Sequence, residues 1–242
     1  EPVIDICESC VKESGSLVKI ESVSDWRNFW QCFLAHANGV IVPNADVSER
    51  LRNYFGDINF MIRPHDIQVV KTKRFSGLRI KKIAIIGAIG PHKGSQLLYS
   101  LANHAVKEHS GIEFVVMGYT DCNSKFRKLS NVTITGPYED RDGLDKLKSL
   151  NCDAALFLSV LPETFSYSLS LAMQAGVYPI AFDLGAQGRR IRDLGIGTVL
   201  DPILMHDSVS LFNAILRINE TVEFDIESHT GYKSHEEYYE IC

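Results

Sequence analysis

The sequence predicts an α/β fold in which a Rossmann-like parallel sheet is covered by helices on both faces. From residue 82 onward, short apolar runs alternate with segments of helical period, and several runs end in glycine. The runs are continuous rather than alternating, which is typical of strands buried on both faces of a parallel sheet. Right-handed crossovers in such a sheet place ligand sites at the carboxyl ends of the strands.

The first part of the chain predicts a smaller, partial group of α/β elements. Residues 1–23 are polar and irregular. Ser24 then reads as the N-cap of a helix that Gly39 ends, and the helix has the apolar spacing of a buried face. That face consists of Trp26, Phe29, Trp30, Phe33 and Leu34.

Two strands and a second helix follow in this first part. Asp46 and Glu49 have capping-box spacing in the second helix. Residues 63–80 are polar and basic without a clear period, which indicates a linker. The expected strands lie at 40–42 and 59–62, and the expected helix lies at 44–54.

Strands and helices then alternate up to residue 219. Residues 183–188 follow a strand and read as a plain turn, although they could also line the rim of a ligand crevice. Residues 221–242 are acidic and aromatic, and we expect a helical tail there. The expected strands lie at 83–86, 114–117, 132–135, 154–158, 178–182 and 198–200, and the expected helices lie at 97–105, 142–149, 166–176, 189–194 and 206–219.

Composition excludes several functional classes. The formal net charge of −5 argues against nucleic-acid binding, because phosphate neutralisation needs a clustered basic surface. No apolar run approaches the length of a bilayer-spanning helix. The 6 cysteines are too scattered for a disulfide scaffold, so a reducing, cytoplasmic compartment fits best, and Cys152 reads as a small core residue.

One group of residues has a superficial resemblance to a zinc site. Cys7 and Cys10 are separated by two residues, and Cys32 and His36 by three. However, Cys32 and His36 fall within the apolar helix, where a small buried cysteine is the ordinary expectation. We therefore expect neither a metal nor another cofactor.

Three glycines, Gly87, Gly118 and Gly136, follow apolar runs that we expect at one edge of the sheet. Glycine tolerates positive φ and lets a ligand approach the backbone. Any one of them could simply serve a turn, but three together favour a ligand crevice. Gly90 and Lys93 follow the first run and open a helix, where a lysine adds positive charge to an anion site. The alternative for Lys93 is a solvated surface residue.

The segment from Pro162 to Gly176 is the most informative in the chain. Glu163 ends a strand-to-helix loop, Ser166 opens a helix and Gly176 closes it. The first N–H groups of a helix lack internal partners and carry the positive end of its dipole, so this layout suits an anionic ligand. Glu163 could bind hydroxyl groups of such a ligand, or it could merely stabilise the helix dipole.

Taken in order, these segments resemble the C-terminal, nucleotide-sugar-binding domain of retaining GT-B glycosyltransferases of the "group 1" family. The resemblance covers roughly residues 80–202, and residues 24–66 are similar to the end of that family's N-terminal domain. The segments that carry it are 86–94, 114–118, 134–138 and 162–167.

The resemblance implies a role for each matching position. Lys93 would contact the donor diphosphate, Glu163 would bind hydroxyls of the transferred sugar, and both are the expected catalytic residues. Gly136 to Tyr138 would pass close to the base, and family members usually need no metal. The expected donor-binding residues are Gly87, Gly90, Gly118, Gly136, Pro137, Tyr138, Thr164, Phe165, Ser166 and Tyr167.

Two positions depart from the family pattern. The family's arginine after the first strand's glycine is Ala88 here, and its second glutamate, which usually binds the ribose, is Leu171. Leucine cannot accept a hydrogen bond from a ribose hydroxyl. These departures keep open a non-catalytic glycosyltransferase-like binding domain. A GT-B nucleotide-sugar epimerase stays open as well, because such an enzyme also places a nucleotide sugar between two such domains.

The resemblance also implies an organisation and a set of partners. We expect the end of the N-terminal domain and a linker at 1–72, the donor-binding domain at 73–220, and the tail at 221–242. The expected partners are a nucleotide-sugar linked to UDP or GDP, a glycan or lipid-linked acceptor, and a missing N-terminal region of the same polypeptide. The expected role is in surface polysaccharide synthesis, in the cytoplasm or peripheral to the inner membrane.

Overall fold

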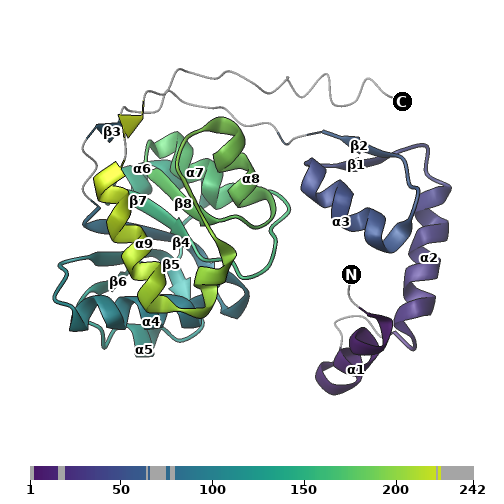
Figure 1. Cartoon of the computed structure of the whole chain (residues 1–242), viewed down its shortest axis with the longest axis horizontal. Coiled ribbons are helices and arrows are strands. Elements are labelled where there is room, and N and C mark those ends of the chain that lie inside the picture. The colour runs from purple at the N-terminus through teal and green to yellow at the C-terminus, as the bar shows by residue number, and fades with distance from the viewer. Residues whose placement is uncertain are drawn as a thin grey trace. The chain divides into compact units, whose positions relative to one another are not determined.

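A computed structural model describes residues 3–15, 20–63, 65, 75–76, 80–221 and 223–224 (Figure 1). Its contacts divide the chain into two units, Glu1–His65 and Asp66–Cys242. Within the described residues, no helix has both the length and the apolar character needed to cross a bilayer.

The second unit is built around a parallel sheet of 6 strands, which confirms the predicted Rossmann-like sheet. The spatial order is β6-β5-β4-β7-β8-β9, so the chain reverses its direction across the sheet between β4 and β7. In open α/β sheets, ligands bind at the carboxyl ends of the strands beside such a reversal. The strands are β4 Lys82–Ile89, β5 Glu113–Thr120, β6 Val132–Ile134, β7 Ala154–Phe157, β8 Tyr178–Phe182 and β9 Thr198–Leu200.

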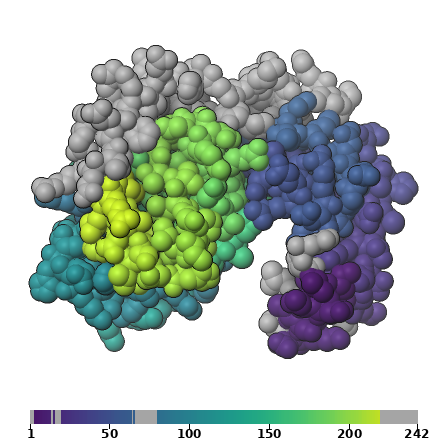
Figure 2. All heavy atoms as spheres, viewed as in Figure 1, coloured from purple at the N-terminus to yellow at the C-terminus, as the bar shows by residue number. Residues whose placement is uncertain are grey.

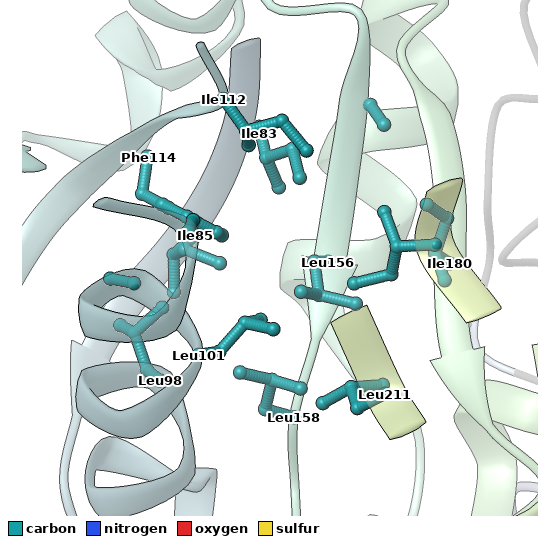
Figure 3. Packing of buried hydrophobic residues seen from close by; sticks show 14 of the residues in the cluster. Ile83, Ile85, Leu98, Leu101, Ile112, Phe114, Leu156, Leu158, Ile180 and Leu211 are labelled. Carbon is teal, nitrogen blue, oxygen red and sulfur yellow. The ribbon is translucent and has the colours of Figure 1, made fainter. Parts of the chain in front are cut away.

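Helices cover both faces of this sheet. On one face, α4 (Ser95–Lys107) and α9 (Ser208–Thr221) pack against Ile83, Leu156 and their neighbours (Figure 3). In the space-filling view, α9 and the segment before it form much of the surface of this unit that faces the viewer (Figure 2). The other face is covered by α6 (Gly143–Ser149), α7 (Tyr167–Ala175) and α8 (Gly185–Leu194).

Adjacent residues of one strand are therefore buried in different cores. Ile83 and Ile85 of β4 belong to the cluster with α4 and α9, whereas Ala84 and Ile86 belong to the cluster with α6, α7 and α8. Since successive side chains of a strand point to opposite faces, a continuous apolar run is what a doubly covered strand needs.

Short elements complete the second unit. The helix expected at 189–194 begins earlier, at Gly185, so the expected plain turn at 183–188 is wrong. Glu223–Phe224 (β10) pairs antiparallel with Phe75–Ser76 (β3), so the helix expected at 221–242 is wrong at these two residues. Most of the expected linker and tail lies outside the described residues. The remaining elements are α5 Asn123–Phe126 and the 3₁₀ helices η1 Pro91–Lys93, η2 Asp140–Asp142 and η3 Pro202–His206.

The first unit contains the expected elements and one more. A parallel pair, β1 (Val40–Val42) and β2 (Phe60–Ile62), flanks α3 (Ala45–Phe55), and its core includes Val42, Phe55, Ile58 and Phe60. α1 (Ile4–Ser14) occupies a stretch that the sequence suggested was irregular. α2 spans Val23–Ala35.

Two expected helix caps in this unit are wrong, and the expected buried face of α2 is confirmed only in part. The N-cap of α2 is Ser22, whose side chain accepts a hydrogen bond from the Asp25 N–H, rather than Ser24. The cap of α3 is Asn44, while Asp46 pairs with Arg50 one turn later. The predicted buried face of α2 is confirmed only in part: Trp30 and Leu34 pack against the core, whereas Trp26, Phe29 and Phe33 are 40%, 63% and 58% exposed.

Candidate functional site

Lys93 and Glu163 meet at the point where the strand order reverses. Lys93 ends the 3₁₀ helix after β4, and Glu163 lies in the loop between β7 and α7. The distance from Lys93 Nζ to Glu163 Oε1 is 3.9 Å. The two residues predicted to be catalytic are thus brought together at the carboxyl edge of the sheet, where a parallel α/β fold places its ligands.

A third polar side chain fixes the glutamate. The Ser159 hydroxyl, which is buried, donates a hydrogen bond of 2.7 Å to Glu163 Oε1. Sequence reasoning missed Ser159, although a serine directly after the apolar run of β7 is a visible signal. The side chains of Lys93 and Glu163 are 29% and 22% exposed, so both remain accessible from solvent.

Beneath the pair, the protein is almost completely filled. A cavity of ≈ 10 Å³ is lined by Lys93, Glu163 and apolar residues of β4 and β7, together with Ser168 and Gln187. That volume has room for about one water molecule. A ligand of this site would therefore contact the lysine and the glutamate from the solvent side.

Gly87 and Gly118 let two strands approach closely beside this pair. They face each other in β4 and β5 with φ of 114° and 137°. A Cβ on Gly118 would lie 2.1 Å from the carbonyl oxygen of Gly87, so any residue other than glycine would clash there. Both strands continue to Ile89 and Thr120, so the expectation that they end at these glycines is wrong. Gly136 does follow its strand, with φ of 83°.

Gly90 and Gly94 shape the turn that carries Lys93. The Gly90 carbonyl accepts hydrogen bonds from the N–H groups of Lys93 and Ser95, at 3.0 and 3.2 Å. Gly94 has φ of 75°, and a Cβ there would lie 2.2 Å from the carbonyl oxygen of Leu158. The start of α4 therefore packs directly against the backbone that follows β7. This packing helps to fix the position of Lys93 relative to Glu163.

Ser166 starts α7 in an unusual backbone conformation. It is the N-cap, with φ of 72° and ψ of 85°. Positive φ is uncommon for residues other than glycine and marks a position that its surroundings hold in place. Phe165 and Ser166 are buried, while Thr164 is exposed and Tyr167 is 70% exposed. The predicted anion site at this helix start therefore combines a fixed backbone with an open side.

Helix α8 supplies the residues that hold this loop, and sequence reasoning missed most of its role. The Ala186 N–H donates to the Glu163 carbonyl at 2.9 Å. Gln187 Nε2 donates to Ser166 Oγ at 2.9 Å, and Arg190 donates to the Phe165 and Ser166 carbonyls. Gln187 and Arg190 are 3% and 8% exposed.

Tyr138 marks a second, more apolar part of the predicted site. A Cβ on Gly143 would lie 3.1 Å from the Tyr138 ring and 3.4 Å from Leu171 Cδ2, so the two side chains pack around the start of α6. Lys146 Nζ donates to the Pro137 carbonyl at 3.3 Å and lies 5.7 Å from the centre of the Tyr138 ring. Burial, aided by Asp140, raises the pKa of Tyr138, so the phenol stays neutral at physiological pH.

The described residues gather no group of three or more His, Cys, Asp or Glu side chains that could hold a metal. Cys7 accepts a weak hydrogen bond from Arg27 at 3.5 Å. His36 Nδ1 lies 2.7 Å from the Cys32 carbonyl, and Cys32 is exposed rather than buried as the sequence suggested.

Comparison with protein families connects this geometry to known sequences. Residues 70–224 match the family model described as "Glycosyl transferases group 1". That span contains every strand of the parallel sheet and both members of the Lys93–Glu163 pair. Comparison with the sequences of curated proteins gives no match.

Solved structures of glycosyltransferases share the fold. S. aureus TarM, solved with UDP, has a TM-score of 0.63 at 20% identity, over 81% of this chain and 40% of TarM. Anabaena HepE with UDP-glucose has a TM-score of 0.62 at 15% identity, over 82% and 59%. WaaB, a lipopolysaccharide outer core galactosyltransferase, has a TM-score of 0.59 at 16% identity, over 90% and 63%. The chain thus spans less than two thirds of each of these structures.

Proposed function

Because the chain belongs to the group 1 glycosyl transferases, we propose that its second unit binds the nucleotide-sugar donor of a retaining glycosyl transfer reaction. The observation that carries this proposal is the Lys93–Glu163 pair, 3.9 Å apart at the reversal of the strand order and beside the start of α7. This arrangement places a cation, helix N–H groups and a hydrogen-bonding carboxylate together at the solvent-accessible carboxyl edge of the sheet.

Each group has a distinct task in the proposed reaction. Lys93 and the first N–H groups of α7 would stabilise the negative charge that develops on the leaving diphosphate, which is the main catalytic device of such a site. Glu163 would accept hydrogen bonds from hydroxyls of the transferred hexose, and Ser159 would keep its carboxylate oriented. We propose that these groups stabilise the charge without a metal.

The wider role is proposed by analogy with the structural neighbours. HepE was solved with UDP-glucose, and WaaB is a lipopolysaccharide outer core galactosyltransferase. We propose a glycan or lipid-linked acceptor in surface polysaccharide synthesis and a cytoplasmic location, compatible with peripheral attachment to the inner membrane. Further sequence of the same polypeptide would complete the acceptor side of the site.

Nucleotide titration tests the donor proposal. UDP, GDP and their hexose derivatives are titrated calorimetrically against the chain. We expect saturable binding. Lys93→Ala should weaken all of these ligands by roughly tenfold to a hundredfold, because a charge-assisted contact to the diphosphate is lost, whereas Glu163→Ala should weaken only the hexose derivatives by that factor, because Glu163 contacts the sugar. The matched controls are Lys128→Ala and Glu113→Ala, because both residues are exposed and Glu113 starts β5 at the opposite edge of the sheet. Absence of binding by any nucleotide at millimolar concentration would contradict the proposal.

A second candidate, a non-catalytic sugar- or partner-binding domain, is favoured by the apolar surroundings of Leu171. Leu171 packs beside Tyr138 and Gly143, where the family pattern has a ribose-binding glutamate, and Ala88 stands in place of the family's arginine. Leu171→Glu separates the two candidates. Tighter binding of UDP in this variant would indicate an otherwise intact ribose site, and measurable but unchanged affinity would show that nucleotides bind without that position. No binding of UDP to either form would favour the non-catalytic candidate.

A further inference from the structure

The loop that carries Glu163 is held by its neighbour α8 at several points. A Cβ on Gly185 would lie 2.8 Å from the Glu163 nitrogen, so only glycine permits this close approach. The next residue, Ala186, donates its N–H to the Glu163 carbonyl at 2.9 Å. Contacts with another helix therefore help to fix the backbone of the loop.

Ser166 is where this fixation matters most. A serine with φ of 72° is strained, and such a conformation persists only where the surrounding structure determines it. Gln187 Nε2 donates to Ser166 Oγ at 2.9 Å, and Arg190 Nη1 donates to the Ser166 carbonyl at 3.0 Å. Two buried side chains of α8 thus hold both the side chain and the backbone of this residue.

Arg190 also makes hydrogen bonds to residues on either side of Ser166. Nη1 also donates to the Phe165 carbonyl at 2.8 Å, and Nη2 donates to Ser170 Oγ at 2.9 Å. Its guanidinium carbon lies 4.4 Å from the centre of the Phe165 ring. A guanidinium is planar, always charged and presents its donors in a fixed fork, so it holds several acceptors in one geometry.

We propose that Arg190 and Gln187 are positioning residues that preorganise the start of α7 for a donor phosphate. By engaging the carbonyl oxygens of Phe165 and Ser166, Arg190 turns these negative ends of the peptide dipoles toward itself. The N–H groups of the first helical turn are then presented to an anion without reorganisation, and the arginine adds a permanent positive charge nearby. This inference rests on the proposed function, because it assigns how that same site achieves affinity.

The first test compares two neighbouring arginines of α8. Arg189 is matched in type, lies one position away and faces Asp193 at 3.7 Å with 39% of its side chain exposed. We expect UDP to bind about tenfold more weakly to Arg190→Gln and about threefold more weakly to Gln187→Ala, since preorganisation is lost. Arg189→Gln should bind as the unmodified chain does. Equal UDP affinity in folded Arg190→Gln and Arg189→Gln would overturn the inference.

A glycine substitution then separates positioning from simple charge. Glycine adopts positive φ without steric cost, so in Ser166→Gly the backbone depends less on the hydrogen bonds from Arg190 to keep this conformation. In the Ser166→Gly background, we expect the loss caused by Arg190→Gln to shrink to about threefold or less. A tenfold loss in both backgrounds would show that the arginine acts by charge alone and would overturn its positioning role.

Amide exchange tests positioning even if the donor proposal fails. If the unmodified chain binds neither UDP nor GDP, the proposed function is wrong, but the state of α7 can still be measured. The Ser170 N–H, which is bonded to the Ser166 carbonyl at 3.3 Å, should exchange about tenfold faster in Arg190→Gln than in Arg189→Gln. Equal exchange would contradict the inference. Should Arg190→Gln fail to fold, Ser170 exchange in Gln187→Ala is compared with that of the unmodified chain: faster exchange is expected because the hydrogen bond to Ser166 Oγ is lost, and equal exchange would contradict the inference.

Discussion

The two units bury their apolar residues in different ways. In the second unit, the adjacent residues Ile83 and Ala84 are both fully buried, because helices cover each face of the sheet. In the first unit, Ile41 and Ile62 of the two parallel strands are 48% and 42% exposed, and so is much of the aromatic face of α2. Parallel strands are ordinarily covered on both faces. The second unit therefore closes its own core and can hold a site in fixed geometry, whereas the first presents apolar surface.

The two units can be followed separately in one experiment. Both tryptophans of the chain, Trp26 and Trp30, lie in α2 of the first unit. Tryptophan fluorescence thus reports on the first unit, and the circular dichroism of the chain is dominated by the larger second unit. Urea unfolding with both signals allows each substitution below to be assigned to its own unit.

The largest expected effect is the loss of a core leucine. Leu156 of β7 is 1% exposed and lies among Ile83, Ile180 and Leu211 (Figure 3). Leu156→Ala leaves a cavity between the sheet and its helices, and we expect the free energy of unfolding of the second unit to fall by about 2–5 kcal/mol. Phe29→Ala in α2 is the contrasting change and should alter the first unit by no more than about 0.5 kcal/mol. Similar losses in both variants would mean that the α2 face is covered in solution.

A smaller effect is expected from a glycine in each unit. Gly118→Ala forces a Cβ to within 2.1 Å of the Gly87 carbonyl oxygen at a φ of 137°. Since backbone must shift, we expect the second unit to lose about 1–3 kcal/mol of unfolding free energy. The added Cβ of Gly39→Ala would meet the end of the Met61 side chain, with Cε at 2.3 Å and Sδ at 3.4 Å, and that flexible side chain can move aside. In Gly39→Ala, the free energy of unfolding of the first unit should change by less than about 1 kcal/mol. A comparable loss in both variants would contradict this account of the Gly87–Gly118 contact.

The sequence predicted the fold well where burial follows from local pattern. The continuous apolar runs located all strands of the sheet, with 178–182 and 198–200 matching β8 and β9 residue for residue. The same reasoning was right only in part about α2, whose apolar period was read as a buried face: Trp30 and Leu34 pack against the core, whereas Phe29 and Phe33 are exposed. Helical period shows which side chains share a face, but what covers that face depends on segments elsewhere in the chain.

The candidate site was predictable only in part. Lys93 and Glu163 each follow an apolar run, so sheet topology was enough to bring them to one edge. Gln187 and Arg190 donate hydrogen bonds to residues 20 to 25 positions earlier in the chain. No spacing within their own segment predicts these hydrogen bonds. The turn expected at 183–188 was wrong for a related reason. Gly185 and Gly188 look like turn residues, but here glycine permits close packing of a helix start against the neighbouring backbone.

The smallest expected effect concerns cysteine reactivity, which compares the exposed face of α2 with the closed core of the second unit. Cys32 lies exposed on α2, whereas Cys152 is half-buried against the core of the second unit. Burial raises the pKa of Cys152 to about 11, and the nearby charge of Lys82 offsets only part of this shift. The thiolate is the reactive form, so labelling of Cys152 by iodoacetamide should be slow at pH 8 and rise about tenfold per pH unit below that pKa.

Cys32 should instead be labelled promptly at pH 8, together with Cys122 as an exposed reference within the second unit. The pKa of Cys122 is lowered by a hydrogen bond from Ser124, which favours its thiolate. Peptide mass spectrometry after short exposure measures all three rates. If Cys32 reacts as slowly as Cys152 while Cys122 reacts fast, the open face of α2 is occupied in solution. The first unit would then not expose its apolar face in solution, and the two units would not differ in how they cover their apolar residues.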